Sequence, residues 1–110
     1  EFTLPPRKHH SYAFCSDTKY DEELVKWIKG VDLLYHEATF MEEHKERANL
    51  TYHSTAAQAG RIAAAAAVGK LIVGHFSTRY KDLSPLLGEV QTEFENAHLA
   101  LESRIFEINE

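Results

Sequence analysis

Short apolar segments that alternate with helical segments constrain the fold of this chain more than any other feature of its sequence. Segments 11–16, 31–36 and 71–74 are short and largely apolar, as strands buried on both faces tend to be. A final, more exposed strand is predicted at 99–108. Parallel strands need crossovers between them, and a helical segment separates each strand from the next. The order therefore predicts an α/β fold, β-α-β-α-β-α-β, with helices packed on a mixed or mostly parallel sheet.

The first two interstrand segments differ in their helix signals. Residues 21–29 begin with acidic side chains, carry apolar residues on one face and stop before Gly30, which suits the end of a helix. Residues 41–52 are rich in Glu, Lys and Arg, and we expect them to be helical or loop-like. Only the first of these segments predicts a helix with defined ends.

Two later helices are predicted from their capping residues. Thr55 and Gln58 have the spacing of a capping box, which opens an alanine-rich helix that ends at Gly69. The small residues of this helix suit close packing against a sheet. Ser84 and Pro85 are a favourable N-cap and first-turn pair for the next helix.

Composition and length narrow the class of protein. The 110 residues suffice for one small domain, with 1–10 expected to be a linker or strand edge and 11–110 to belong to the domain. No apolar run approaches the roughly 20 residues that span a bilayer, and no signal-peptide pattern opens the chain. Cys15 is the single cysteine, which excludes an internal disulfide and fits a reducing compartment. A net charge of −5 argues against binding nucleic acid through whole-surface attraction, so a polyanionic substrate needs a local basic patch or a cationic metal.

Carboxylates and histidines follow the predicted strands at the points where each strand ends. Asp17 follows the first strand, Glu37 ends the second, and His75 ends the third. His53 precedes a helix, in a loop that faces the same edge. In open α/β sheets, ligands bind beyond the carboxyl ends of the strands. We therefore expect these side chains to converge at one edge of the sheet.

Each of these residues also has a purely structural interpretation. Asp17 could cap the turn before the first helix, and His75 could be a buried core histidine. His53 could be a polar residue at a helix entry, and Glu37 a surface carboxylate. Independent structural uses have no reason to share one sheet edge, so their joint occurrence favours a functional site.

Metal-assisted hydrolysis needs this mixture of side chains. Imidazole and carboxylate are both ligands that suit zinc, and a carboxylate can bridge two ions held about 3.5–4 Å apart. Such a pair of ions supports phosphoryl transfer. A histidine that is not a ligand can protonate the leaving oxygen when a carboxylate favours its charged form, and Glu37 is the candidate for that carboxylate.

Four ordered motifs resemble those of ribonuclease Z, the transfer RNA 3′-processing endoribonuclease of the metallo-β-lactamase superfamily. They are Ser-Asp-Thr at 16–18, His-Glu-Ala-Thr at 36–39, His-Ser-Thr at 53–55 and Gly-His-Phe-Ser-Thr-Arg-Tyr at 74–80. The spacing is similar too, with 36 residues from Asp17 to His53 and 22 from His53 to His75. The resemblance implies the carboxyl-terminal half of a metallo-β-lactamase-like αββα sandwich.

The resemblance also implies a role for each matching residue. Asp17 would bridge two zinc ions, and His75 would ligate one of them. His53 would be the general acid that protonates the 3′ oxygen of the cleaved transfer RNA, with Glu37 holding its imidazole. Arg79 would meet a substrate phosphate, for which a guanidinium fork is well suited. The implied whole protein is a cytoplasmic homodimer that acts on precursor transfer RNA.

The remaining histidines match no ligand position of that family. His36 is expected to be buried and structural. No role is assigned to the others, which are His9, His10, His44 and His98.

The chain also departs from the family pattern. The family's His-x-His-x-Asp-His signature, its later single ligand histidine and its substrate-clamping arm are absent, and Ser16 and Lys19 are milder departures. We therefore expect a piece of a longer protein that is inactive by itself and that self-associates through uncovered apolar surface. Two alternatives remain open: another hydrolase of the same superfamily, and a non-catalytic interaction module derived from an enzyme half.

Overall fold

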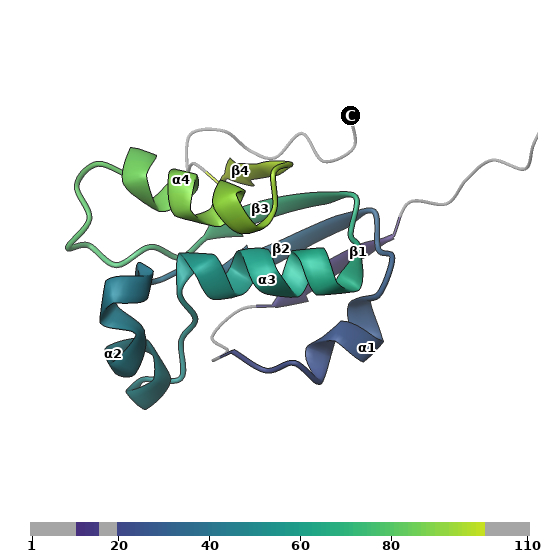
Figure 1. Ribbon diagram of the computed structural model, residues 1–110, viewed down its shortest axis with the longest axis horizontal. Helices are drawn as coiled ribbons and strands as arrows, with labels where there is room; N and C mark the ends of the chain where they lie inside the picture. The colour runs from purple at the N-terminus through teal and green to yellow at the C-terminus, as the bar shows by residue number, and fades with distance from the viewer. Residues whose placement is uncertain (1–10, 16–19, 101–110) are drawn as a thin grey trace, which may run out of the picture.

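The computed structural model describes residues 11–15 and 20–100, which form four parallel strands with helices between them (Figure 1). The strands are β1 (Tyr12–Cys15), β2 (Leu33–Glu37), β3 (Lys70–Gly74) and β4 (Ala97–Leu99), and they lie in that order in the sheet. The helices are α1 (Leu24–Ile28), the 3-10 helix η1 (Glu42–His44), α2 (Lys45–Leu50), α3 (Ala56–Ala66) and α4 (Ser84–Glu93). The alternating α/β order predicted from the sequence is confirmed. No helix in these described ranges is long and apolar enough to cross a membrane.

The capping box predicted for α3 is present. The Thr55 hydroxyl accepts a hydrogen bond from the Gln58 backbone N–H at 3.1 Å, and the Gln58 side chain accepts one from the Thr55 N–H at 2.9 Å. The end of α3 differs from the prediction, because the left-handed residue that stops it is Ala67 and not Gly69. Gly69 lies against the residue before β2, where an added Cβ would come 2.6 Å from the carbonyl oxygen of Asp32. Gly69 therefore allows two backbone segments to approach closely and does not end the helix.

The predicted N-cap of α4 is wrong by one residue. Ser84 is the first helical residue, and Leu83 occupies the N-cap position. The carboxylate of Asp82 accepts the Ser84 backbone N–H at 3.0 Å, so a backbone donor at the helix start is satisfied by Asp82 and not by the Ser84 side chain. The hydrogen bonds from Ser84 also lower the pKa of Asp82. The predicted last strand is observed as β4, and its predicted continuation to residue 108 lies outside the described residues.

The core lies between the sheet and α3. Leu34, Leu71 and Val73 point from β2 and β3 toward the helices and are fully buried, and Ala59 and Ala63 of α3 are fully buried in the same cluster. Small side chains on α3 thus let the helix approach the sheet, as the sequence predicted.

Close packing extends to α4 as well. A Cβ on Gly60 would lie 2.7 Å from the Cβ of Glu93 and 2.8 Å from the carbonyl oxygen of Val90. The absence of a side chain at this position of α3 therefore sets how closely the two helices pack.

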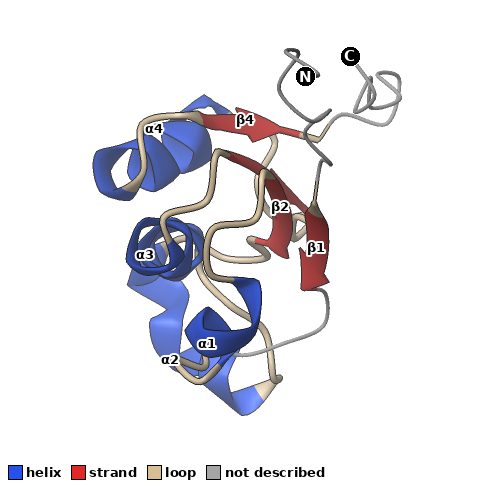
Figure 2. Cartoon of the chain, turned by 90° about the vertical axis from the view of Figure 1, so that its right-hand side faces the viewer, coloured by secondary structure: helices blue, strands red, loops and turns tan. Residues whose placement is uncertain are grey.

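The opposite face of the sheet carries no helix among the described residues, as Figure 2 shows. Tyr12 and Phe14 of β1 point to this open face and are 53% and 73% exposed. Phe14 stacks on Tyr35 of β2 with ring centroids 4.4 Å apart. Self-association through this exposed aromatic surface stays a prediction.

Candidate active site

The segment after β2 ties the three described motifs together through its backbone. On one side, the Ala38 N–H donates to the Gly74 carbonyl at 2.8 Å, and the Thr39 carbonyl accepts from the Ser77 N–H at 2.9 Å. On the other side, the Thr39 N–H donates to the Ser54 carbonyl at 3.1 Å. These bonds connect the carboxyl ends of β2 and β3 to the loop before α3. The glutamate and the two histidines singled out in the sequence therefore meet at one edge of the sheet, as predicted.

His53 is held by the way α2 ends. The Tyr52 backbone is left-handed, with φ of 60°. The His53 N–H donates to the Ala48 carbonyl at 2.8 Å, and the Tyr52 N–H donates to the Asn49 carbonyl at 3.3 Å. This pair of bonds is a Schellman motif, and it directs the chain from α2 toward β2. The position of the histidine backbone is thus fixed by the carboxyl end of a short helix.

The side chain of Glu37 organises the site. It is fully buried, and its Oε2 atom accepts hydrogen bonds from His53 Nδ1, the Thr39 hydroxyl and the Ser54 backbone N–H, each at 2.9 Å. His53 Nδ1 also lies 3.2 Å from Oε1. Because a carboxylate only accepts, Nδ1 of His53 carries a proton, and Nε2 is the nitrogen left to act on a substrate. The carboxylate therefore fixes both the orientation and the protonated nitrogen of the imidazole.

His75 follows β3 in a strained backbone conformation. Its φ is 62°, in the left-handed region that residues other than glycine seldom adopt. Its ring is exposed and lies edge-on to the ring of His53, with centroids 5.2 Å apart. Strain of this kind costs on the order of 1 kcal/mol and is concentrated at functional sites. The outlier motivates the hypothesis that the exposed imidazole has a use other than packing.

The donor atoms of Glu37, His53 and His75 lie within 4.8 Å of one another, so the three residues form a possible metal-binding group. The contacts of these residues indicate two different roles, one for Glu37 and His53 and another for His75. The carboxylate of Glu37 is already surrounded by three donors, which suits the holding of His53 more than the coordination of an ion. The exposed imidazole of His75 fits a zinc ligand. Asp17, the predicted bridging ligand, lies outside the described residues.

Arg79 and His53 both lie near the aromatic ring of Phe40. Its Cζ atom is 5.5 Å from the centroid of the Phe40 ring, and that ring is 6.3 Å from the ring of His53. Arg79 Nη1 also lies 3.1 Å from Nε2 of His44, a residue to which the sequence assigned no role. Nothing in the polar stretch 41–52 marked that histidine, because the contact depends on a loop 35 residues away.

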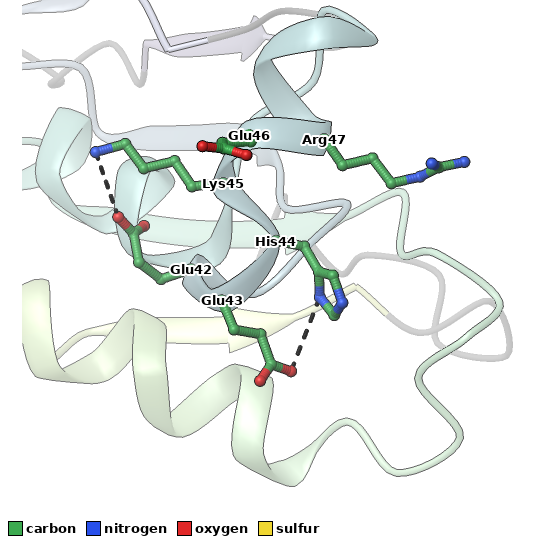
Figure 3. A pocket seen from close by; sticks show the side chains of 6 residues that line it. All are labelled: Glu42, Glu43, His44, Lys45, Glu46 and Arg47. Carbon is green, nitrogen blue, oxygen red and sulfur yellow. Dashed lines mark ion pairs between the residues drawn. The ribbon is translucent and has the colours of Figure 1, made fainter.

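A hollow of about 400 Å³ lies beside η1 and the start of α2 (Figure 3). Beside it, the Lys45 ammonium lies 3.7 Å from the Glu42 carboxylate, and Nδ1 of His44 lies 3.8 Å from the Glu43 carboxylate. The side chains that line it come from one short segment and include none of the predicted catalytic or metal-binding residues: Glu42, Glu43, His44, Lys45, Glu46 and Arg47. The hollow is therefore distinct from the group formed by Glu37, His53 and His75.

His36 is fully buried, as expected of a structural residue. Its Nδ1 lies 2.8 Å from the Glu37 carbonyl oxygen, which makes Nδ1 the donor, and its Nε2 has no partner among the described residues. Burial lowers the pKa of this imidazole below its ordinary value of 6.5. The ring is thus held in its neutral form inside the core.

Replacing His36 with leucine is expected to reduce the dependence of stability on acid pH. The pKa of His36 is lowered in the folded state, so the unfolded chain binds a proton first as the pH falls below 6.5. The histidine's contribution is complete above that pH and is lost as the pH falls through the folded-state pKa. The test is urea unfolding of the full-length protein at several pH values between about 7.5 and 5. Equal pH slopes for the wild type and H36L would contradict the prediction.

The chain is similar to known proteins both in sequence and in fold. No protein-family model matches the chain. Ribonuclease Z from Cytophaga hutchinsonii is 49% identical over 110 residues, covering 100% of this chain and 35% of the relative. The metallo-β-lactamase fold protein YhfI from Bacillus subtilis is 25% identical with a TM-score of 0.77, covering 83% of this chain and 37% of that one. A long form RNase Z from yeast is 30% identical with a TM-score of 0.70, covering 81% of this chain and 12% of that one.

The similar proteins show which fold this chain has and how much of their length it spans. The chain spans about a third of the length of the curated relatives it matches. Together with the four parallel strands and their alternating helices, the structural matches confirm the fold class predicted from the sequence.

Proposed function

We propose that this chain, a homologue of ribonuclease Z with the metallo-β-lactamase fold, forms part of the active site of a zinc-dependent endoribonuclease. The whole protein would remove 3′ trailers from precursor transfer RNA. Residues 11–110 would be the carboxyl-terminal half of its catalytic domain. The observation that carries the proposal is the buried Glu37 carboxylate hydrogen-bonded to His53, with His75 beside it.

His53 would be the general acid. Its Nδ1–H is held by Glu37, so its Nε2 is free to carry the second proton to the departing 3′ oxygen of the transfer RNA. The buried carboxylate holds the ring by its Nδ1–H and prevents it from rotating away. The edge-on contact with His75 places this proton donor next to the proposed metal ligand.

His75 and Asp17 would hold zinc, with the carboxylate bridging two ions. When bound, zinc would supply Lewis acidity for hydrolysis of the phosphodiester. One imidazole and one carboxylate are too few to close a tetrahedral site, so the rest of the protein would have to supply further ligands. For the same reason, this chain alone would be inactive.

Arg79 would bind a phosphate of the RNA. Arg79 is exposed, and its guanidinium lies over Phe40, whose ring centroid is 6.3 Å from that of His53. A guanidinium that shares this aromatic neighbour with the proton donor can hold a phosphate on the strand being cut. We further propose that the whole protein is a cytoplasmic homodimer, in line with the similarity of this chain to ribonuclease Z.

The proposal is tested by measuring zinc content and cleavage of precursor transfer RNA for this chain and for the full-length protein. The full-length protein is expected to bind two zinc ions and to cut beyond the discriminator nucleotide, leaving a 3′ hydroxyl. The chain alone is expected to do neither. Hydrolysis of small esters or cyclic nucleotides by the full-length protein without RNA cleavage would favour another superfamily hydrolase. Tight binding of two zinc ions by the chain alone would contradict the half-site proposal.

A further inference from the structure

A second hydrogen-bonded histidine lies beside Arg79. His44 Nε2 is 3.1 Å from Arg79 Nη1, and its Nδ1 is 3.0 Å from the Tyr80 hydroxyl. The same hydroxyl accepts the Met41 backbone N–H at 2.8 Å. The chain of contacts thus runs from the backbone at the start of η1 through Tyr80 and His44 to the guanidinium.

The direction of each hydrogen bond follows from the groups involved. A guanidinium only donates, so Nε2 of His44 must accept from Arg79. Nδ1 of the neutral ring then carries the proton and donates to the Tyr80 hydroxyl. Glu43 is a weaker partner for Nδ1, because its carboxylate lies 3.8 Å away. The arrangement therefore assigns a neutral His44 that offers a lone pair to the arginine.

The charge of Arg79 is left available by this arrangement. Among residues 11–15 and 20–100, Arg79 forms no ion pair with a carboxylate. A carboxylate would orient the guanidinium but would also cancel its charge toward an incoming anion. A neutral imidazole orients the guanidinium and leaves its full charge for a phosphate.

The ring of Phe40 also restricts the Arg79 side chain. The guanidinium lies over that ring, and His44 contacts the ring as well, with centroids 6.3 Å apart. Phe40 is itself buried and packs edge-on against His53. The arginine is therefore held by two contacts, an aromatic face and one hydrogen bond.

We infer that His44 is a positioning residue that holds Arg79 in place for a substrate phosphate. The inference rests on the proposed function, because it needs Arg79 to contact the RNA. An arginine side chain that is already ordered loses less conformational freedom when it binds, which strengthens binding without adding a contact. His44 should therefore affect how tightly the RNA binds and leave the chemical step unchanged.

The test uses steady-state cleavage of precursor transfer RNA by the full-length protein. H44A is expected to raise KM by about tenfold, as the loss of one hydrogen bond to a charged group would, with kcat within about twofold of the wild type. H44Q should restore most of the affinity, because its amide oxygen can accept from Arg79. T92A, which removes an exposed neutral side chain on α4, is the matched control and should leave KM unchanged.

A double-variant cycle separates the inference from the proposed function. If His44 acts through Arg79, H44A should have little further effect in an R79A background. An increase of KM in R79A with none in H44A would overturn the role of His44 and leave the proposed function standing. Additive effects, or a fall in kcat alone in H44A, would also overturn it. No effect of R79A on KM would refute the phosphate contact on which the inference rests.

Discussion

Replacing His53 with alanine in the full-length protein is expected to slow cleavage of precursor transfer RNA by about 10²–10⁴-fold, with no loss of zinc. The size follows from the usual contribution of a positioned general acid. Zinc content should hold because His53 Nδ1 is bonded to Glu37, which makes this ring a proton donor and not a ligand. Single-turnover cleavage, with zinc measured on the same samples, checks both parts of the prediction.

A substrate with sulfur in place of the 3′ bridging oxygen makes the test specific for proton donation. The pKa of a thiol is about 8.5, whereas that of bulk water is about 15.7, so a thiolate departs without a proton from the enzyme. The defect of H53A should shrink to less than about tenfold on this substrate. An equal defect on both substrates, or a loss of zinc from H53A, would mean that the histidine has another role.

Changing Glu37 to glutamine is expected to lower the same rate by about 10²–10³-fold through its effect on His53. Glutamine keeps one oxygen to accept from Thr39, Ser54 and His53, so the fold should tolerate the change. It removes the negative charge next to the imidazole that is proposed to donate the proton. E95Q, which neutralises an exposed carboxyl, is the matched control and should be active.

Two readouts show whether Glu37 acts through His53. The sulfur substrate should rescue E37Q as it rescues H53A, and the double variant should be no slower than H53A alone, because the two side chains work as a unit. A defect that persists with sulfur and adds to that of H53A would instead favour a direct role of Glu37, such as metal coordination within the group it forms with His75.

Burial made the strands predictable from the sequence. A segment that is apolar on both faces has few alternatives to a central parallel strand, so β2 and β3 were located to within two residues at either end. Helix ends were less predictable, because neighbouring polar residues compete for the same backbone groups. Asp82 supplied the acceptor that Ser84 was expected to provide, and Ala67 took the left-handed position expected of a glycine.

The site was predictable where it depends on strand ends and unpredictable where it depends on loops. Glu37 and His53 meet because the chain after β2 pairs with the loop before α3, which sheet geometry makes probable. The contact of His44 with Arg79 has no such cause, since it depends on how a short polar helix lies against a distant loop. Asp17 lies outside the described residues, and its bridging role stays a prediction.

The Schellman motif at the end of α2 leads us to expect that heating abolishes activity before it unfolds the sheet. The helix has six residues and buries only Ala48, so it lacks the length and the apolar face that stabilise helices. Segments of this kind open locally, with a free energy well below that of global unfolding. The backbone of His53 is anchored to the last turn of this helix. On heating, catalysis should therefore be lost when α2 frays, at a temperature at which the sheet and α3 are still folded.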